Sequence, residues 1–172
     1  MSRFNPASPE FSKEEFPFYW LARVHGAYTL EMEKALKPLG LDIPTWRTLM
    51  IVKEHEVSSM SEIALHAIAK LSTVTKTVYR MRAEGLVETA TAEHDARVTV
   101  VSLTQLGREA LERSQLATRH IFQRSFHGLT PLQIRKLNES LHLILDNLSP
   151  RHADVASGRT GAAWVTKAAE QD

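Results

Sequence analysis

Apolar residues recur every three or four positions over most of the chain, which is the spacing of amphipathic helices. The first such run follows Pro17 and ends at Gly40, a residue that suits the end of a helix. A second run has Pro44 in its first turn and reaches about His55. The pattern therefore predicts a long helix followed by a shorter one. The stripe of the long helix contains Leu21, Val24, Tyr28, Met32, Ala35 and Leu39.

Two more short helices are predicted before residue 85. Ser59 and Glu62 have the spacing of a capping box, which begins the first of them. The second extends over residues 72–84. When successive residues are placed 100° apart, four apolar side chains share an arc of about 80°: Leu71, Val74, Val78 and Met81. We expect this arc to pack against Ile63, Leu65 and Ile68.

After Gly85 the helical period gives way to that of strands. Leu86–Thr91 and Val98–Leu103 are rich in Val and Thr, and the polar segment AEHDAR separates them, which predicts a β-hairpin. Two long helices follow, with capping signals at Thr104 and Thr130. This order is the layout of a winged helix-turn-helix, a mainly α fold with a small β-hairpin wing, flanked by N- and C-terminal helices.

Composition excludes several classes of function. The chain has no cysteine, so disulfides, thiolate nucleophiles and cysteine-based peroxide sensing are absent. The eight histidines are spread out, so we expect no metal site, and no motif indicates a cofactor. The sequence lacks the G-x-S-x-G, Walker, G-x-G-x-x-G and H-E-x-x-H motifs and predicts no enzyme. Without a membrane span or a signal-peptide core, a cytoplasmic protein is expected.

The helix at residues 72–84 has a polar, cationic face. Ser72, Thr73, Lys76 and Arg80 lie opposite its apolar arc, and residues 70–82 include four cations and no acid. Such a local face suits a helix that enters the major groove of DNA, even though the formal net charge of the chain is only +1. A surface helix with an ordinary solvated face is the alternative.

The predicted hairpin carries an acid–base pair at its tip. Asp95 and Arg97 are two positions apart, so the carboxylate can orient the guanidinium for insertion into a minor groove. A contact that only stabilises the turn is the alternative. Together with the cationic helix face, the tip favours DNA binding.

We divide the chain into an arm at residues 1–15, a winged helix-turn-helix DNA-binding domain at 41–103 and dimerisation helices at 16–40 and 104–149. Residues 150–172 form a tail, in which Trp164 is a candidate docking point. The apolar stripes of the terminal helices exceed what one chain of 172 residues is expected to cover. A homodimer built from those helices would cover them.

Four motifs resemble the MarR family of bacterial winged-helix regulators: LKPLGL (Leu36–Leu41), PTWRTL (Pro44–Leu49), STVTKTVYRMRAEGLVE (Ser72–Glu88) and HDARVTVVSLTQLG (His94–Gly107). The last is the most specific, because a D-x-R pair is followed by LT and then G. The resemblance covers roughly half of the chain. It implies an obligate homodimer that represses transcription by occupying a pseudo-palindromic operator, with adjacent major grooves about 34 Å apart, until a small molecule releases it.

The resemblance also assigns site residues. Expected DNA contacts are Ser72, Thr73, Thr75, Lys76 and Arg80 in the recognition helix and, in the wing, Arg97 oriented by Asp95. Members of the family bind ligands between the dimerisation helices and the DNA-binding lobe. Here this predicts a ligand site at Trp20, Arg23, His25, Tyr28, Trp46, Arg47 and Met50.

These side chains favour a small aromatic acid as effector, such as a benzoate, hydroxycinnamate or indole-acetate type compound. An aromatic slot stacks on the ring, and an arginine at one end pairs with the carboxylate; Arg23 is the leading anchor. The alternatives are that Trp46 belongs to the core and Arg47 is a surface charge. The alternative function is a sequence-tolerant architectural or protein-binding winged-helix protein without an effector.

Overall fold

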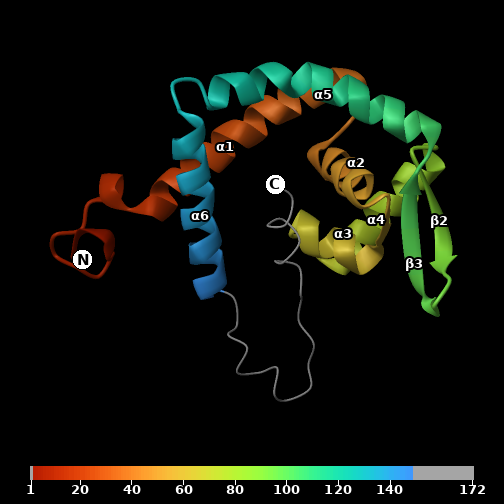
Figure 1. Ribbon diagram of the computed structural model, residues 1–172, viewed down its shortest axis with the longest axis horizontal. Helices are drawn as coiled ribbons and strands as arrows, with labels where there is room; N and C mark the ends of the chain where they lie inside the picture. Colours follow the sequence, from red (N-terminus) through yellow and green to blue (C-terminus); the bar gives the residue numbers. More distant parts are fainter. Residues whose placement is uncertain (1, 149–172) are drawn as a thin grey trace, which may run out of the picture. The chain divides into compact units, whose positions relative to one another are not determined.

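The computed structural model describes residues 2–148, which contain six α-helices and three β-strands (Figure 1). The helices are α1 (Pro17–Leu36), α2 (Ile43–His55), α3 (Met60–Ala67), α4 (Leu71–Ala83), α5 (Gln105–Ser125) and α6 (Pro131–Leu148), and the strands are β1 (Val57–Ser59), β2 (Val87–Ala92) and β3 (Asp95–Leu103). Short 3-10 helices lie at Ser2–Phe4, Lys13–Glu15 and Lys37–Leu39. The chain divides after Ser125 into two compact units. The predicted tail, with Trp164, lies outside the described residues.

Capping interactions begin the helices of the first unit. At α3 the Ser59 hydroxyl accepts a hydrogen bond from Glu62 N at 3.2 Å, and the Glu62 carboxylate accepts one from Ser59 N at 2.7 Å, which confirms the predicted capping box. At α2 the cap is Asp42, whose Oδ1 accepts the Thr45 N–H at 2.8 Å. Both caps satisfy backbone donors that a helix start leaves unpaired.

In the first unit, α1 and α5 run side by side, while α2, α3 and α4 form a cluster joined to the β2–β3 hairpin (Figure 1). One apolar core extends through these elements. Its fully buried side chains include Met32, Leu36, Leu49, Val52, Ile63, Val78, Met81, Val101 and Leu111. The expected mainly α winged helix-turn-helix is therefore confirmed.

The predicted apolar arc of α4 is wrong at one end. Three of its four residues are buried, but Leu71 is 50% exposed. Of the residues expected to cover the arc, Ile63 is buried, whereas Leu65 and Ile68 are 47% and 92% exposed. Leu71 is the first residue of α4 and Ile68 follows the last residue of α3, so both lie beyond the part where the two helices pack.

The sheet has the antiparallel order β1-β3-β2. β2 and β3 form the predicted hairpin, in which Val87 lies opposite Leu103. β1 was not predicted; it pairs Val57 with Ser102 and Ser59 with Val100 of β3. A strand of three residues is too short to show an alternating pattern.

Gly107 lets α5 approach the base of the wing. A Cβ atom added at Gly107 would lie 2.0 Å from the carbonyl oxygen of Leu86, closer than any real contact. Thr104 completes the junction: its N donates to Leu86 O at 3.2 Å, and its hydroxyl donates to Gly85 O at 2.6 Å. The same hydroxyl accepts from Gly107 N at 3.0 Å and so caps α5 as predicted.

The second unit contains α6, which begins at the predicted signal. Gln133 Oε1 accepts from Thr130 N at 2.8 Å, and Thr130 Oγ1 accepts from Gln133 N at 3.3 Å. Several of its leucines are exposed, among them Leu137 (45%) and Leu148 (67%). No helix within residues 2–148 is long and apolar enough to cross a membrane.

Candidate DNA-binding surface and effector site

The first half of α4 presents hydroxyl groups and a cation to solvent. Ser72, Thr73 and Lys76 are exposed, and Thr75 is half-buried. The Thr75 hydroxyl donates to Leu71 O at 2.8 Å, so its oxygen remains able to accept a hydrogen bond. This face can offer donors and acceptors to base edges together with one positive charge.

Arg80, which the sequence places on the same face, is bound within the protein. Its Nη2 donates to Asp42 Oδ2 at 2.8 Å and to Thr45 Oγ1 at 2.9 Å, both at the start of α2. Partial burial alone would raise the pKa of Asp42, but hydrogen bonds from Thr45 and the Arg80 guanidinium outweigh it and hold that pKa below its usual range. The DNA contact predicted for Arg80 therefore competes with an ion pair that sequence reasoning missed.

The wing tip presents an oriented guanidinium. Asp95 Oδ1 accepts the backbone N–H of Arg97 at 2.9 Å and its Nε–H at 3.2 Å, while Nη2 lies 3.5 Å from Oδ2. The backbone hydrogen bond, followed by the side-chain one, lowers the pKa of Asp95, so the carboxylate stays ionised. The Arg97 side chain is nevertheless 91% exposed. The predicted pair forms and leaves the cation facing solvent.

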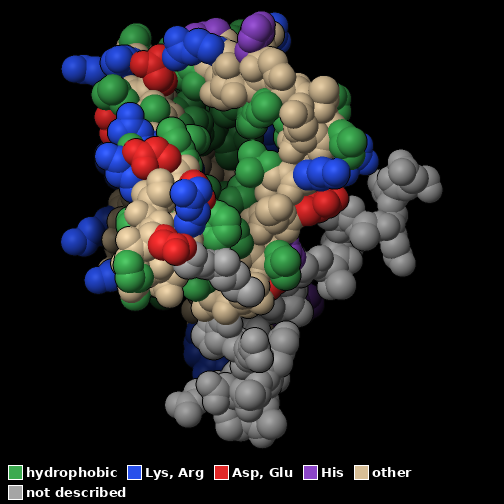
Figure 2. Space-filling model, turned by 90° about the vertical axis from the view of Figure 1, so that its left-hand side faces the viewer, with side chains coloured by type: hydrophobic (Ala, Val, Ile, Leu, Met, Phe, Trp, Pro, Cys, Tyr) green, Lys and Arg blue, Asp and Glu red, His purple; other side chains and the backbone are tan. Residues whose placement is uncertain are grey.

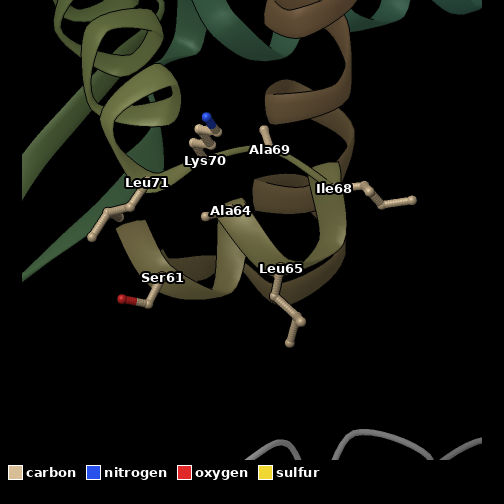
Figure 3. A pocket seen from close by; sticks show the side chains of 7 residues that line it. All are labelled: Ser61, Ala64, Leu65, Ile68, Ala69, Lys70 and Leu71. Carbon is tan, nitrogen blue, oxygen red and sulfur yellow. The ribbon is translucent and has the colours of Figure 1, made fainter. Parts of the chain in front are cut away.

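A surface pocket lies at the turn between α3 and α4, next to the exposed face of α4. It is lined by Ser61, Ala64, Leu65, Ile68, Ala69, Lys70 and Leu71 (Figure 3). The side chains of Leu65, Ile68 and Leu71 point away from the helices in Figure 3. Ile68 has a φ of 53°, in the left-handed region that β-branched residues rarely adopt. Helical periodicity alone does not indicate this pocket, because it places these apolar side chains in the core.

The four predicted ligand residues of α1 do not gather at one point. Trp20 and Tyr28 are eight positions apart, about 12 Å along a helix. Trp20 is 49% exposed, and its Nε1 donates to Glu14 O at 2.8 Å. The guanidinium carbon of Arg23 lies 5.5 Å from the centre of the Tyr19 ring. His25 is exposed, so the first half of this set lies on the surface of α1.

The second half of the predicted site lies where α1, α2 and α5 meet. The Tyr28 ring centre is 6.3 Å from that of Phe122 in α5. Burial raises the pKa of Tyr28, while the positive charge of Arg47 in α2 acts in the opposite direction. Met50 Sδ accepts a weak hydrogen bond from Gln115 of α5 at 3.8 Å.

Trp46 is a core residue with one unsatisfied donor. It is 8% exposed, and its Nε1–H has no hydrogen-bond partner among the described residues. A buried donor without a partner costs about 1–3 kcal/mol, so a ligand that accepts from this group would recover a favourable interaction. No group of three or more His, Asp or Glu side chains within residues 2–148 is arranged to hold a metal ion.

Comparisons with known proteins identify the family. No protein-family model matches the chain. The chain is 56% identical over 147 residues to the HTH-type transcriptional repressor IacR of Pseudomonas putida, a match that covers 86% of this chain and 88% of that protein. A MarR-family transcriptional regulator from Silicibacter pomeroyi has a similar structure, with a TM-score of 0.73 and 26% identity over 80% of this chain and 92% of that one. The chain belongs to the MarR family.

Two further solved structures share the fold at lower identity. A mutant of MarR from E. coli, solved with operator DNA, has a TM-score of 0.66 and 20% identity over 73% of this chain and 91% of that one. Bordetella bronchiseptica BpsR, whose DNA binding is regulated by 6-hydroxynicotinic acid, has the same score and identity over 75% of this chain and 98% of that one. As a member of the MarR family, the chain is a transcriptional regulator rather than an enzyme.

Proposed function

We propose that this MarR-family chain is a repressor that binds a pseudo-palindromic operator as a homodimer and is released by a small aromatic acid. The observation that carries the proposal is a solvent-facing donor surface on α4 combined with an oriented, 91% exposed Arg97 at the wing tip. A helix with exposed hydroxyl groups and a lysine fits a major groove, and an outward guanidinium fits the adjoining minor groove.

In this proposal Ser72, Thr73, Thr75 and Lys76 contact base edges and phosphates, and Arg97, oriented by Asp95, contacts the minor groove. Lys76 and Arg97 would each release counterions from the DNA on binding, so affinity should fall as salt rises. Arg80 is left out of this set because its guanidinium is bound to α2.

The homodimer is supported by apolar side chains that the chain leaves uncovered. Val24 of α1 is 64% exposed and Leu116 of α5 is 66% exposed. On α6, Leu143 is 61% exposed. Figure 2 shows hydrophobic side chains lying among charged ones on the surface. The strongest support comes from α6, which has several exposed leucines and no buried residue, because an amphipathic helix is expected to bury its apolar face against a partner.

The proposed effector site has two parts, because the seven predicted side chains do not gather at one point. Tyr28, Trp46, Arg47 and Met50 belong to the part where α1, α2 and α5 meet. Trp20, Arg23 and His25 lie on the surface of α1. Neither Arg23 nor Arg47 has an ion-pair partner among the described residues, so each can pair with a carboxylate, although the Arg23 guanidinium also lies over the Tyr19 ring. The unsatisfied Nε1–H of Trp46 offers a third donor close in sequence to Arg47. The regulation of BpsR by an aromatic acid supports the same ligand class here.

The decisive experiment measures binding to DNA from immediately upstream of the gene, with and without benzoate, 4-coumarate and indole-3-acetate. We expect salt-dependent binding by a dimer and release by at least one acid. Arg23→Ala should abolish the response to the acid and Arg47→Ala should weaken it, whereas Lys53→Ala, at an exposed cation of α2 outside the proposed site, is the control. Equal affinity for every duplex at physiological salt would favour an architectural protein instead. Absence of acid binding in calorimetry would overturn the effector.

A further inference from the structure

One arginine links α4 to the start of α2. The two hydrogens of Arg80 Nη2 are shared between Asp42 Oδ2, at 2.8 Å, and Thr45 Oγ1, at 2.9 Å. Asp42 uses its other oxygen to cap α2, and Thr45 is only 3% exposed. Arg80 is 38 and 35 residues away from these partners, so the contact is purely tertiary.

We propose that Arg80 is a positioning residue that holds α4 against the first turn of α2 and does not bind DNA itself. This inference rests on the proposed DNA-binding function. Arg80 follows Leu71, the first residue of α4, by nine positions, which is about 13 Å along the helix. Recognition helices of this type contact bases mainly from their N-terminal residues.

The ion pair also weakens Arg80 as a ligand for phosphate, although it occupies only Nη2 and leaves the Nε and Nη1 donors without a hydrogen bond among the described residues. The carboxylate of Asp42 offsets the charge that would attract a phosphate group. To bind phosphate through Nη2, Arg80 would have to give up a charge-assisted hydrogen bond. It would also leave the Asp42 carboxylate unpaired near the negatively charged DNA. Keeping the pair intact avoids both costs.

The link joins the recognition helix to the proposed effector site. Thr45 immediately precedes Trp46 and Arg47 in α2. A ligand that shifts this turn of α2 therefore acts directly on the acceptors of Arg80. Through the Arg80 guanidinium, a bound effector can change the angle of α4, and operator binding requires that α4 keep its angle.

Two substitutions that each remove a charge test the positioning role of Arg80. They are Asp42→Asn and Arg80→Gln, made separately and together. Asparagine caps helices as well as aspartate does, so Asp42→Asn removes the charge and keeps the start of α2. We expect each single variant to bind operator DNA about fivefold more weakly, equivalent to ~1 kcal/mol. The double variant should bind no more weakly than the singles, and the salt dependence should equal that of the wild type.

A phosphate contact would give the opposite pattern. Arg80→Gln would then lower the slope of log affinity against log salt by about 0.9. Asp42→Asn would bind DNA equally or more tightly, because it removes a negative charge near the phosphates. Arg80→Lys separates the two roles again: lysine keeps the charge needed for a phosphate but loses the planar geometry of the guanidinium. We expect Arg80→Lys to bind weakly, and wild-type affinity would overturn the proposal.

Lys53→Gln is the matched control, because Lys53 is an exposed cation of α2 with no hydrogen bond or ion pair among the described residues. It changes the net charge equally and should leave affinity within about twofold. Thermal unfolding checks that each variant folds. If Arg80→Gln does not fold, the result for Asp42→Asn decides the outcome.

The aromatic acid tests the route from effector to α4. If the acid releases less DNA from Asp42→Asn than from the wild type, the route is supported. If both the release by the acid and the DNA affinity of Asp42→Asn are unchanged, the route is overturned. Wild-type protein that ignores promoter DNA would overturn the proposed function, whereas normal binding by Asp42→Asn overturns only the role of Arg80.

Discussion

The wing and the α2–α4 contact each contain an aspartate–arginine pair, and the two pairs differ in the distance along the sequence between their partners and in the exposure of the arginine. Asp95 and Arg97 are two residues apart at a hairpin tip, and Arg97 is 91% exposed. Asp42 and Arg80 join two helices, and Arg80 is 48% exposed. The local pair orients a cation toward solvent, whereas the tertiary pair uses its cation to join two helices. A basic residue on a predicted DNA-binding face is therefore not by itself a DNA contact.

The difference also separates two ways of weakening DNA binding. The wing pair belongs to one hairpin, so changing it removes a contact and leaves the helices in place. The α2–α4 pair sets how two helices meet, so changing it moves other contacts. Four substitutions, taken from the largest expected effect to the smallest, test this distinction.

The wing can hold Arg97 in a fixed position only if the start of β2, next to Leu86, packs tightly against α5. Gly107→Ala should destabilise the fold by about 3 kcal/mol or more, because the new Cβ atom would meet Leu86 O at 2.0 Å. Chemical unfolding measures the loss. Gly26→Ala in α1 is the control, since its added Cβ meets no atom within 4 Å, and alanine there should stabilise the helix. Similar stability in both variants would show that the wing base is not tightly packed.

Removing the outward cation tests the wing directly. Arg97→Ala should weaken binding to every duplex about tenfold and lower the salt slope by about one. Fluorescence anisotropy over a range of salt concentrations measures both, with Lys53→Ala as the control for net charge. An unchanged slope would mean that the Asp95–Arg97 pair only stabilises the turn.

The orienting carboxylate should matter less than the cation that it orients. Asp95→Asn keeps a side chain that accepts the Arg97 backbone N–H but removes the charge. We expect about a twofold loss of operator affinity with an unchanged salt slope, because Arg97 loses orientation but remains present. A loss as large as that of Arg97→Ala would mean that Asp95 contacts DNA or shapes the whole tip.

The smallest expected effect is on acid stability. Folding lowers the pKa of Asp42, so its ionised form stabilises the protein above the unfolded pKa of about 3.9, and this stabilisation is lost as pH falls through the folded pKa. Because Asp42 is 45% exposed, we expect only about 0.5 kcal/mol after solvent screening. Urea unfolding from pH 6 to pH 2.5 should show wild type and Asp42→Asn converging at low pH. A constant difference between them would contradict the assigned ionisation.

Local signals allowed much of the fold to be predicted. The capping pair Ser59–Glu62 and the cap at Thr104 form as their spacing indicates, because they depend on residues within one helical turn. The Asp95–Arg97 pair forms for the same reason. Such interactions are encoded within a few residues and need no knowledge of the rest of the chain.

The errors arose at element ends and across long separations. Leu65, Ile68 and Leu71 have apolar side chains in the right period, but Ile68 and Leu71 lie at the turn between α3 and α4, and all three are exposed. Periodicity gives the direction of a side chain and not the presence of a neighbour. Arg80 was placed on the DNA-facing side by its angle, and its partners 35 and 38 residues away have no signature in a single sequence.

The sequence alone determined the type and order of the elements, the helix caps and the wing pair, because each depends on neighbours along the chain. Only the tertiary structure decided which cations face solvent, which apolar residues find a covering partner and why Gly107 must lack a side chain. Each of these properties depends on contacts between segments that are far apart in the sequence. For this reason the two arginines differ: Arg97 remains exposed and available to DNA, whereas Arg80 is paired with Asp42.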